Sequence, residues 1–255
     1  MRIDLNCDMG EFDASDRQAL DETIMPLVTS VSIACGFHAG NQDLMRRTVR
    51  LARMHGAAIG AHPSFADREN FGRVEQTLPA EQIENLIAYQ VGALAGIAAL
   101  ERASLNHVKP HGGLYSLAAR DPIVAEVIAR TVATFDRRLI LFGLAGSQLI
   151  DAGRRTGLVV AQEAFVDRAY QPDGTLLPRR FEGAVIHDER RVLDRVRRLV
   201  RDGRIETSDG TMIQVHPDTI CLHGDTPGAC NLAKLIRQEL THMGVQLQAI
   251  HHACL

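Results

Sequence analysis

The polar chemistry of this sequence is concentrated at the ends of its apolar, strand-like runs. Six such runs pass directly into charged, histidine or glycine residues, and the segments are DLNCDMGE (4–11), IACGFHAG (33–40), IGAHPSF (59–65), NHVKPHGGLYS (106–116), QEAFVDRAY (162–170) and TICLHGDTPGA (219–229). In folds built from parallel strands and helices, the active site lies at the carboxyl ends of the strands. Reactive side chains that recur at these places predict an enzyme.

Asp8, His38 and His62 follow three successive strand-like runs and form the first candidate site. One carboxylate and two imidazoles are a common ligand set for a divalent metal ion. A carboxylate at this place could instead act as a general base or cap a helix, and capping competes most strongly for Glu11. Lone histidines are also more often structural groups held by hydrogen bonds, so a metal role and a structural role both stay open.

Three further residues are candidates for catalysis. Lys109 and His111 follow the fourth strand-like run, and Glu163 ends a later one. Only two of the 28 basic residues are lysines, so a lysine at a strand end indicates a need for a compact point charge, with chance placement as the competing explanation. The candidates for substrate binding are Asn6, Arg168, His223 and Asp225.

Hydrophobic periodicity predicts alternating strands and helices. The predicted strands cover residues 2–6, 31–35, 57–61, 105–109, 139–144, 158–163 and 219–223. The predicted helices cover 42–55, a long segment after Pro79, a segment from Pro122, 147–157, a segment after Asp188, and 227–243. Polar carboxyl ends on nearly every strand favour a closed barrel over an open sheet, because only a closed ring brings all these ends to one pocket. We expect one domain over residues 1–255, with a hairpin excursion near 204–217.

Composition places the chain among globular proteins. Hydrophobic residues make up 45% of its 255 residues, the net charge is -3 and the pI is about 6.4. This balance argues against nucleic-acid partners and anionic lipid surfaces. We expect no apolar run of membrane-spanning length and no signal segment, which favours the cytoplasm. Five cysteines without a CxxC pair argue against a disulfide framework, and Cys7, Cys35 and Cys221 are expected to be buried as small hydrophobic residues.

The polar segments together resemble those of the LamB/YcsF family. The resemblance rests on DLNCDMGE, IACGFHAG, IGAHPSF with Asp67 and FGR (71–73), VKPHGGLY, EAFVDRAY with DGTLLPR (173–179), and ICLHGDTP, which occur in order over nearly the whole chain. It implies an α/β fold, a seven-stranded (β/α) barrel of the type found in glycoside hydrolases and deacetylases. It also implies ATP-dependent opening of 5-oxoproline to glutamate, with Mg²⁺ accompanying ATP and with 5-oxoprolinase subunits B and C as partners.

Roles in that reaction can be assigned to residues as a hypothesis. Lys109 would neutralise phosphate and oxyanion charge, and Asp8 or His62 would handle protons. Arg168 would grip the carboxylate of the substrate, unless it pairs with a neighbouring acidic residue. The helix that begins near residue 227 could also hold an anion at its N-terminus.

Two residues depart from the family pattern. Ser32 and Ser116 stand where asparagine is usual. Because an asparagine at either place could hydrogen-bond a ligand, the departures bear on substrate identity more than on the reaction class.

Two other functions stay open. A metal-dependent deacetylase or amide hydrolase acting without ATP would use the Asp-His-His set. A non-catalytic binding subunit would explain why no GxxxxGK[ST] phosphate loop is found.

Overall fold

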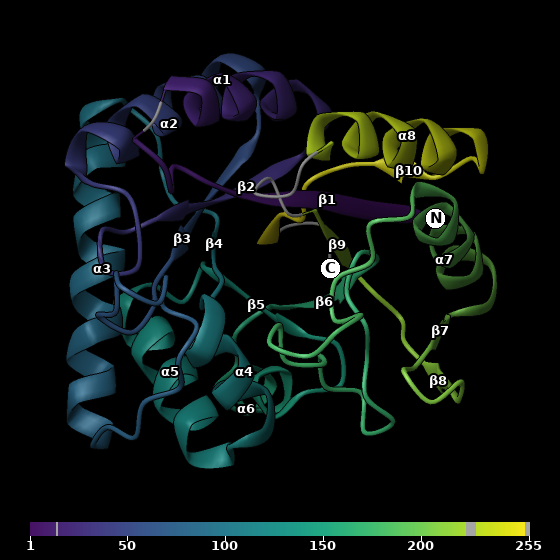
Figure 1. Cartoon of the computed structure of the whole chain (residues 1–255). Coiled ribbons are helices and arrows are strands. Elements are labelled where there is room, and N and C mark those ends of the chain that lie inside the picture. Colours follow the sequence, from purple (N-terminus) through teal and green to yellow (C-terminus); the bar gives the residue numbers. More distant parts are fainter. Residues whose placement is uncertain (14, 223–227, 253–255) are drawn as a thin grey trace.

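Seven parallel strands close into a barrel in the computed structural model of the chain, which describes residues 1–13, 15–222 and 228–252 (Figure 1). The barrel strands are β1 (Arg2–Met9), β2 (Ser30–Ala34), β3 (Ala58–His62), β4 (His107–Val108), β5 (Ile140–Leu144), β6 (Val160–Phe165) and β9 (Thr219–Leu222). Each strand pairs in parallel with the next, and β1 pairs with both β2 and β9, which closes the ring. The predicted seven-stranded (β/α) barrel is confirmed.

Helices connect the strands and cover the outside of the barrel (Figure 1). They are α1 (Ser15–Ile24), the 3-10 helix η1 (Met25–Leu27), α2 (Gln42–His55), α3 (Ala80–Leu100), α4 (Gly112–Arg120), α5 (Pro122–Phe135), α6 (Gln148–Arg155), α7 (Glu189–Asp202) and α8 (Ala229–His242). Their apolar faces join the strand residues Leu5, Cys7 and Met9 in one large hydrophobic core. Cys35 and Cys221 belong to the same core, so the predicted burial of the three cysteines is confirmed.

Several helix boundaries lie where the sequence predicts them. Asp121 and Asp188 each accept hydrogen bonds from two backbone N–H groups at the start of α5 and α7, and Ser147 accepts one at the start of α6. α7 ends at Gly203, whose φ of 62° lies in the left-handed region that glycine adopts without steric cost. These ends are predictable because capping chemistry depends on a few adjacent residues.

Other boundaries differ from the prediction. β1 continues past residue 6 because its backbone still pairs with β2 as far as Met9 opposite Ile33. β4 is reduced to two residues, and the following Pro110 has no N–H to extend it. Helix α4 was not predicted, since it opens with two glycines, which have low helix propensity.

The C-terminal part of the chain adds two features outside the ring. The predicted hairpin at 204–217 is confirmed as β7 (Arg204–Glu206) and β8 (Met212–Gln214), which pair antiparallel. The residues after Val245, which carry weak strand character in the sequence, contain β10 (Gln246–Leu247), and this strand pairs in parallel with the start of β1.

The inside of the barrel is polar along β1. Asp4 accepts hydrogen bonds from the hydroxyls of Ser30 and Thr219, at 2.6 and 2.5 Å. Further along β1, the side-chain amide of Asn6 donates to Thr219 Oγ1 at 2.7 Å. Alternate residues of a strand point to one face, so Asp4, Asn6 and Asp8 form a polar row that leads towards the carboxyl end of the ring.

Helix α3 corrects the expectation that no apolar run reaches membrane-spanning length. Among the described residues it is the one helix that is long and apolar enough to cross a membrane, by length and composition. Its mean hydropathy is 1.4 and 33% of the apolar window is buried. The core helix of a globular protein passes the same test, and Ile83, Ile87 and Leu94 of α3 belong to the hydrophobic core.

Candidate active site

Six of the predicted site residues meet at the carboxyl mouth of the barrel. They are Asp8 in β1, His38 in the loop after β2, His62 at the end of β3, Lys109 directly after β4, His111 at the N-cap of α4 and Glu163 in β6. All are buried except Asp8, whose side chain is 13% exposed. The closed ring of parallel strands brings them together, and their catalytic roles stay predictions.

Lys109 is the centre of a group of hydrogen-bonded residues, here called the lysine network, which consists of Asn6, Asp8, Lys109 and Glu163. Lys109 Nζ lies 2.7 Å from Asp8 Oδ1, 2.9 Å from Glu163 Oε1 and 2.8 Å from Asn6 Oδ1. Burial acts to lower the pKa of Lys109, but attraction to Asp8 and Glu163 outweighs it and holds the pKa well above its usual value. The ammonium group therefore stays charged and fixes the Asp8 carboxylate in place.

Glu163 is occupied on both carboxylate oxygens. Oε1 accepts from Lys109 and, at 3.0 Å, from Asn6 Nδ2, and Oε2 accepts from the hydroxyl of Tyr115 at 2.8 Å. Burial and repulsion from Glu163 raise the pKa of Tyr115 well above its usual value, so this hydroxyl remains a donor. These contacts favour positioning roles for Glu163 and Asn6 over direct contact with a substrate.

A second group, here called the histidine cluster, consists of Glu11, His38, His62 and His111. The rings of His38 and His111 stack with centroids 3.8 Å apart and an interplanar angle of 6°. His111 Nδ1 lies 2.9 Å from His62 Nε2, and Glu11 Oε1 lies 3.2 Å from His38 Nε2. His62 Nε2 is also 3.2 Å from Asp8 Oδ2, which joins the cluster to the lysine network.

Burial keeps two rings of the histidine cluster neutral. It lowers the pKa of His38 well below its usual value, and repulsion from His62 adds to this effect. Burial likewise lowers the pKa of His111 well below its usual value, with His38 and His62 adding repulsion. Neutral imidazoles offer a lone pair that can bind a metal ion or take up a proton.

The loop after β3 fits its backbone against the histidine cluster. The carbonyl oxygen of Phe71 accepts a hydrogen bond from His111 Nε2 at 2.9 Å. Phe71 has a φ of 56°, which is costly for a bulky residue, and such strain is found at functional sites. At Gly72, φ is 64° and an added Cβ would lie 2.7 Å from His38 Cβ, so glycine is required there. The backbone of the FGR segment thus supports the histidine cluster.

The residues that could hold one metal ion are Glu11, His38, His62 and His111, whose candidate ligand atoms all lie within 4.8 Å of one another. The predicted set of Asp8, His38 and His62 shares two histidines with this group. Asp8 is instead paired with the buried lysine. Glu11 Oε1 faces His38 Nε2 at 3.2 Å, and the capping role that competes for Glu11 in the sequence stays open.

The predicted substrate-binding residues outside the lysine network are Arg168, His223 and Asp225. Arg168 is buried, and its guanidinium donates to the carbonyl oxygens of Ala184 and Leu177 at 3.1 and 2.8 Å. Burial, followed by repulsion from a neighbouring arginine, lowers the pKa of Arg168 to about 10. Its role as a substrate clamp stays a prediction, and His223 and Asp225 lie outside the described residues.

His107 is a buried residue that the sequence analysis did not single out. Its ring stacks on Phe142 with centroids 4.1 Å apart, and its Nε2 lies 3.2 Å from Ser32 Oγ. Burial lowers the pKa of His107 to about 3, so the ring is neutral. The departure at Ser32 therefore lies inside the barrel against His107, whereas Ser116 is exposed on α4.

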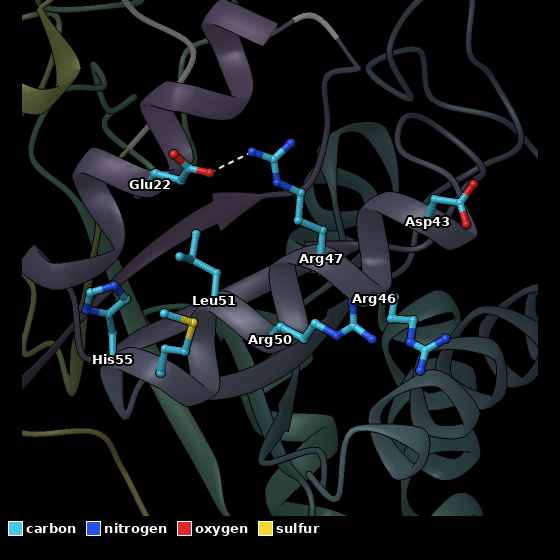
Figure 2. A pocket seen from close by; sticks show the side chains of 8 residues that line it. Glu22, Asp43, Arg46, Arg47, Arg50, Leu51 and His55 are labelled. Atoms are coloured by element: carbon cyan, nitrogen blue, oxygen red, sulfur yellow. Dashed lines mark hydrogen bonds and ion pairs between the residues drawn. The ribbon is translucent and has the colours of Figure 1, made fainter.

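An open groove of about 680 Å³ lies on the outer face of α2 (Figure 2). It is lined by Glu22, Asp43, Arg46, Arg47, Arg50, Leu51, Met54 and His55. Arg47 pairs with Glu22 at 2.6 Å, as the dashed line in Figure 2 marks, and Arg50 pairs with Glu101 at 3.0 Å. The described residues that line this groove include no member of the histidine cluster or the lysine network, so the groove is separate from the candidate active site.

The closed ring of parallel strands, with helices outside it, places the chain in the class of (β/α) barrels, a fold that carbohydrate esterases share. A family 4 carbohydrate esterase from Streptomyces lividans superposes with a TM-score of 0.50 at 12% identity, over 99% of this chain and 94% of that one, which shows a likeness of fold alone. The Lactam Utilization Protein from Thermus thermophilus superposes with a TM-score of 0.90 at 41% identity, over 98% of this chain and 100% of that one.

Within this class, the chain belongs to the LamB/YcsF family, whose profile matches residues 3–254. A curated relative, the A subunit of the 5-oxoprolinase of Methylococcus capsulatus, is 49% identical over 97% of this chain and 95% of its own length. The family resemblance carried by the polar segments is thereby confirmed.

Proposed function

We propose that this chain is the A subunit of an ATP-dependent 5-oxoprolinase, which opens the lactam of 5-oxo-L-proline to L-glutamate together with subunits B and C. The observation that carries the proposal is the 49% identity, over 97% of the chain, to a relative that is named as the A subunit of 5-oxoprolinase. The likeness to a lactam utilization protein supports the same class of substrate.

The stability of the lactam explains the need for ATP. An amide carbonyl is a poor electrophile, and transfer of the γ-phosphoryl group from Mg²⁺-ATP to its oxygen activates the carbonyl carbon. Water then adds to that carbon, and the C–N bond breaks as the nitrogen takes up a proton and leaves as the free amine. A second water releases inorganic phosphate from the resulting acyl phosphate to give glutamate. In this proposal Lys109 supplies positive charge beside the developing oxyanion, and Asp8 or His62 moves the protons. Arg168 is proposed to hold the substrate carboxylate, because it is a guanidinium near the end of β6.

The proposal is tested with the purified chain, alone and with subunits B and C. We expect the complete complex to release one glutamate for each ADP formed from 5-oxoproline and ATP, and to release none when ATP is omitted. Glutamate release at an undiminished rate without nucleotide would overturn the ATP-dependent assignment.

A second candidate function is a metal-dependent amide hydrolase or deacetylase that acts without ATP. The observation that favours it is the histidine cluster, whose ligand atoms could hold a metal ion. This function predicts turnover without nucleotide that is lost on chelation and restored by a transition metal. Chelation alone does not separate the two candidates, because ATP chemistry also requires Mg²⁺. A non-catalytic binding subunit, the third candidate, predicts that substitutions at the barrel mouth leave turnover by the complex unchanged.

We also propose that residues 1–255 form one domain, because the strands of the ring come from both ends of the chain and β10 returns to β1. A cytoplasmic location is proposed because ATP, the proposed co-substrate, is available there. Fractionation of cells that produce the chain with its partners tests this location directly.

A further inference from the structure

We propose that the histidine cluster binds one transition-metal ion of the zinc class. Its four ligand residues are Glu11, His38, His62 and His111, and Asp8 is not among them. The inference depends on hydrogen bonds that fix the tautomer of each ring, and it does not depend on the proposed substrate or on ATP.

Two of the rings have their protons placed by backbone carbonyls. A carbonyl oxygen can only accept, so His62 Nδ1, which lies 2.7 Å from the carbonyl oxygen of Lys109, carries a hydrogen. His111 Nε2 carries a hydrogen for the same reason, because it lies 2.9 Å from the carbonyl oxygen of Phe71. The opposite nitrogens, His62 Nε2 and His111 Nδ1, therefore present lone pairs, and they face each other at 2.9 Å.

The third ring is set by a hydroxyl whose own hydrogen is already engaged. Ser64 Oγ donates to the carbonyl oxygen of Phe65 at 2.8 Å, so it accepts from His38 Nδ1 at 2.9 Å. The side-chain amide of Gln90 on α3 accepts from the Ser64 N–H at 3.0 Å and donates to the Ser64 carbonyl at 2.8 Å. This arrangement holds His38 with its Nε2 lone pair towards Glu11 Oε1, 3.2 Å away.

The cluster therefore presents two pairs of facing acceptors in a buried place. His38 and His62 are each 1% exposed, and the side chain of Glu11 is 8% exposed. Facing acceptors without a cation between them cost free energy in such surroundings. One proton can join only one of the two pairs, whereas one metal ion can bind all four donor atoms once the stacked rings of His38 and His111 turn so that both lone pairs point at it. Hydrogen bonds behind metal-bound imidazoles have this same orienting function in metal sites.

The donor set indicates the class of metal. Three imidazole nitrogens and one carboxylate oxygen suit zinc, cobalt, nickel or iron, whereas magnesium and calcium prefer oxygen ligands. Zinc–ligand bonds of about 2.0–2.1 Å put tetrahedral ligand atoms about 3.3 Å apart. The distances of 2.9, 3.2 and 3.8 Å between neighbouring donor atoms of the cluster bracket that value.

Asp8 stays outside the ligand set because Lys109 holds its Oδ1 at 2.7 Å. Its other oxygen lies 3.2 Å from His62 Nε2, beside the place where the ion would bind. From there Asp8 could accept a hydrogen bond from a molecule bound to the metal, as a base next to the metal ion does in metal-assisted hydrolysis.

The experiment measures zinc binding by the chain alone, without nucleotide, substrate or partner subunits. After dialysis against a chelator, titration calorimetry with zinc is expected to give one site per chain, and cobalt(II) in its place is expected to give visible absorption bands of a low-coordinate site. Glu11→Gln and His111→Ala each alter a proposed ligand and are expected to weaken zinc binding by more than about a hundredfold, beyond the roughly 10–100-fold cost of changing a residue that only orients a ligand. His55→Ala, on the exposed end of α2, is the matched control and is expected to bind as the wild type does.

Asp8→Asn distinguishes the two possible ligand sets, since a change beside the ligands should cost no more than roughly 10–100-fold in zinc affinity, below the loss expected of a ligand. Loss of binding in Asp8→Asn with full binding in His111→Ala would overturn the proposal, as would the absence of stoichiometric zinc binding by the wild-type chain. Circular dichroism of each variant excludes unfolding as the cause of a loss. Because the readout is binding by the chain alone, a failure here is distinguishable from a failure of glutamate release by the complex.

Discussion

At the scale of the residue, Lys109 shows how a buried charge can be a fixed part of a site. Its ammonium group contacts side-chain oxygens of Asn6, Asp8 and Glu163. Asn6 and Asp8 lie two residues apart on β1, and Glu163 lies on β6. Arginine carries a larger, planar group with five donors. The enclosed space around Lys109, which is 1% exposed, fits the compact ammonium and not the fork of a guanidinium.

We therefore expect Lys109→Arg to lower kcat/KM of the reconstituted complex by about a hundredfold, because displacement of Asp8 by about 1 Å is sufficient for such a loss. Lys234→Arg, on the exposed face of α8, is the control and should leave kcat/KM unchanged. Steady-state kinetics with 5-oxoproline and ATP measure both. Near-wild-type turnover by both variants would remove Lys109 from the mechanism.

The site residues could be predicted from the sequence where they directly follow a strand. They could not be predicted where contacts between distant loops bring them into the site. His38 and His62 were proposed together because both stand at strand ends, and the structure puts both in the histidine cluster. The sequence predicts a catalytic role for His111 and leaves capping as the strongest competing role for Glu11, because spacing along the chain does not show that two loops converge on the same point. His107 was missed because an inward-facing histidine in a two-residue strand has no periodicity to mark it.

At the scale of the element, α1 carries a largely buried carboxylate against the turn that follows β1. Asp21 Oδ2 accepts a hydrogen bond from the N–H of Gly10 at 2.9 Å. Burial raises the pKa of Asp21 to about 6, with repulsion from Glu11 and Glu22 adding to the rise and Arg47 opposing it. The folded state therefore binds the Asp21 proton more tightly than the unfolded state. The contribution of this protonation to the free energy of unfolding is complete below the pKa of Asp21 in the unfolded state, and it is lost as pH rises through about 6, the pKa in the folded state.

Asp21→Asn should therefore stabilise the fold at neutral pH, since the amide keeps an acceptor for Gly10 and removes the buried charge. We expect the substitution to raise the free energy of unfolding by up to about 3 kcal/mol near pH 7.5, and by about 2 kcal/mol less than that near pH 4.5. Urea unfolding at the two pH values measures this. Glu84→Gln, on the exposed face of α3, should show the same small effect at both, and a pH-independent effect of Asp21→Asn would contradict the expectation.

The elements were predictable wherever local chemistry sets their ends. Asp121, Ser147 and Asp188 begin their helices as expected, because an N-cap needs only the next two or three N–H groups. Helix α4 and the short β4 were not predicted in this form, because a pair of glycines and a proline obscure the pattern there. Their boundaries depend on packing against the loop after β3, where the N–H of Gly113 donates to the carbonyl of Gly72.

At the scale of the whole molecule, closure of the ring depends on polar contacts inside it. Asp4 accepts hydrogen bonds from Ser30 of β2 and Thr219 of β9, which flank β1 on its two sides. Burial raises the pKa of Asp4, and the hydrogen bonds from these hydroxyls oppose the rise. Removal of the carboxylate would leave buried hydroxyls without their acceptor.

We expect Asp4→Ala to lower the free energy of unfolding by about 2–4 kcal/mol. Glu84→Ala, an exposed acidic residue on α3, should change it by less than about 0.5 kcal/mol. Urea unfolding at neutral pH compares the two variants with the wild type. A loss for Asp4→Ala no greater than that of the control would show that the ring closes without this contact.

The pairing of β1 with β9 also sets an order of assembly during synthesis. Asp4 accepts its hydrogen bond from Thr219 across 215 positions of the sequence. The first strand of the ring therefore cannot complete its pairing until the last strand of the ring has been synthesised. Until then β1 has an open edge, and contacts of such long range form slowly. Asn6 reaches Thr219 and Glu163 only in the closed ring, so a nascent or truncated chain that lacks β9 has no complete lysine network. The assembled mouth of the barrel is thus obtained only from chains that have been synthesised through β9.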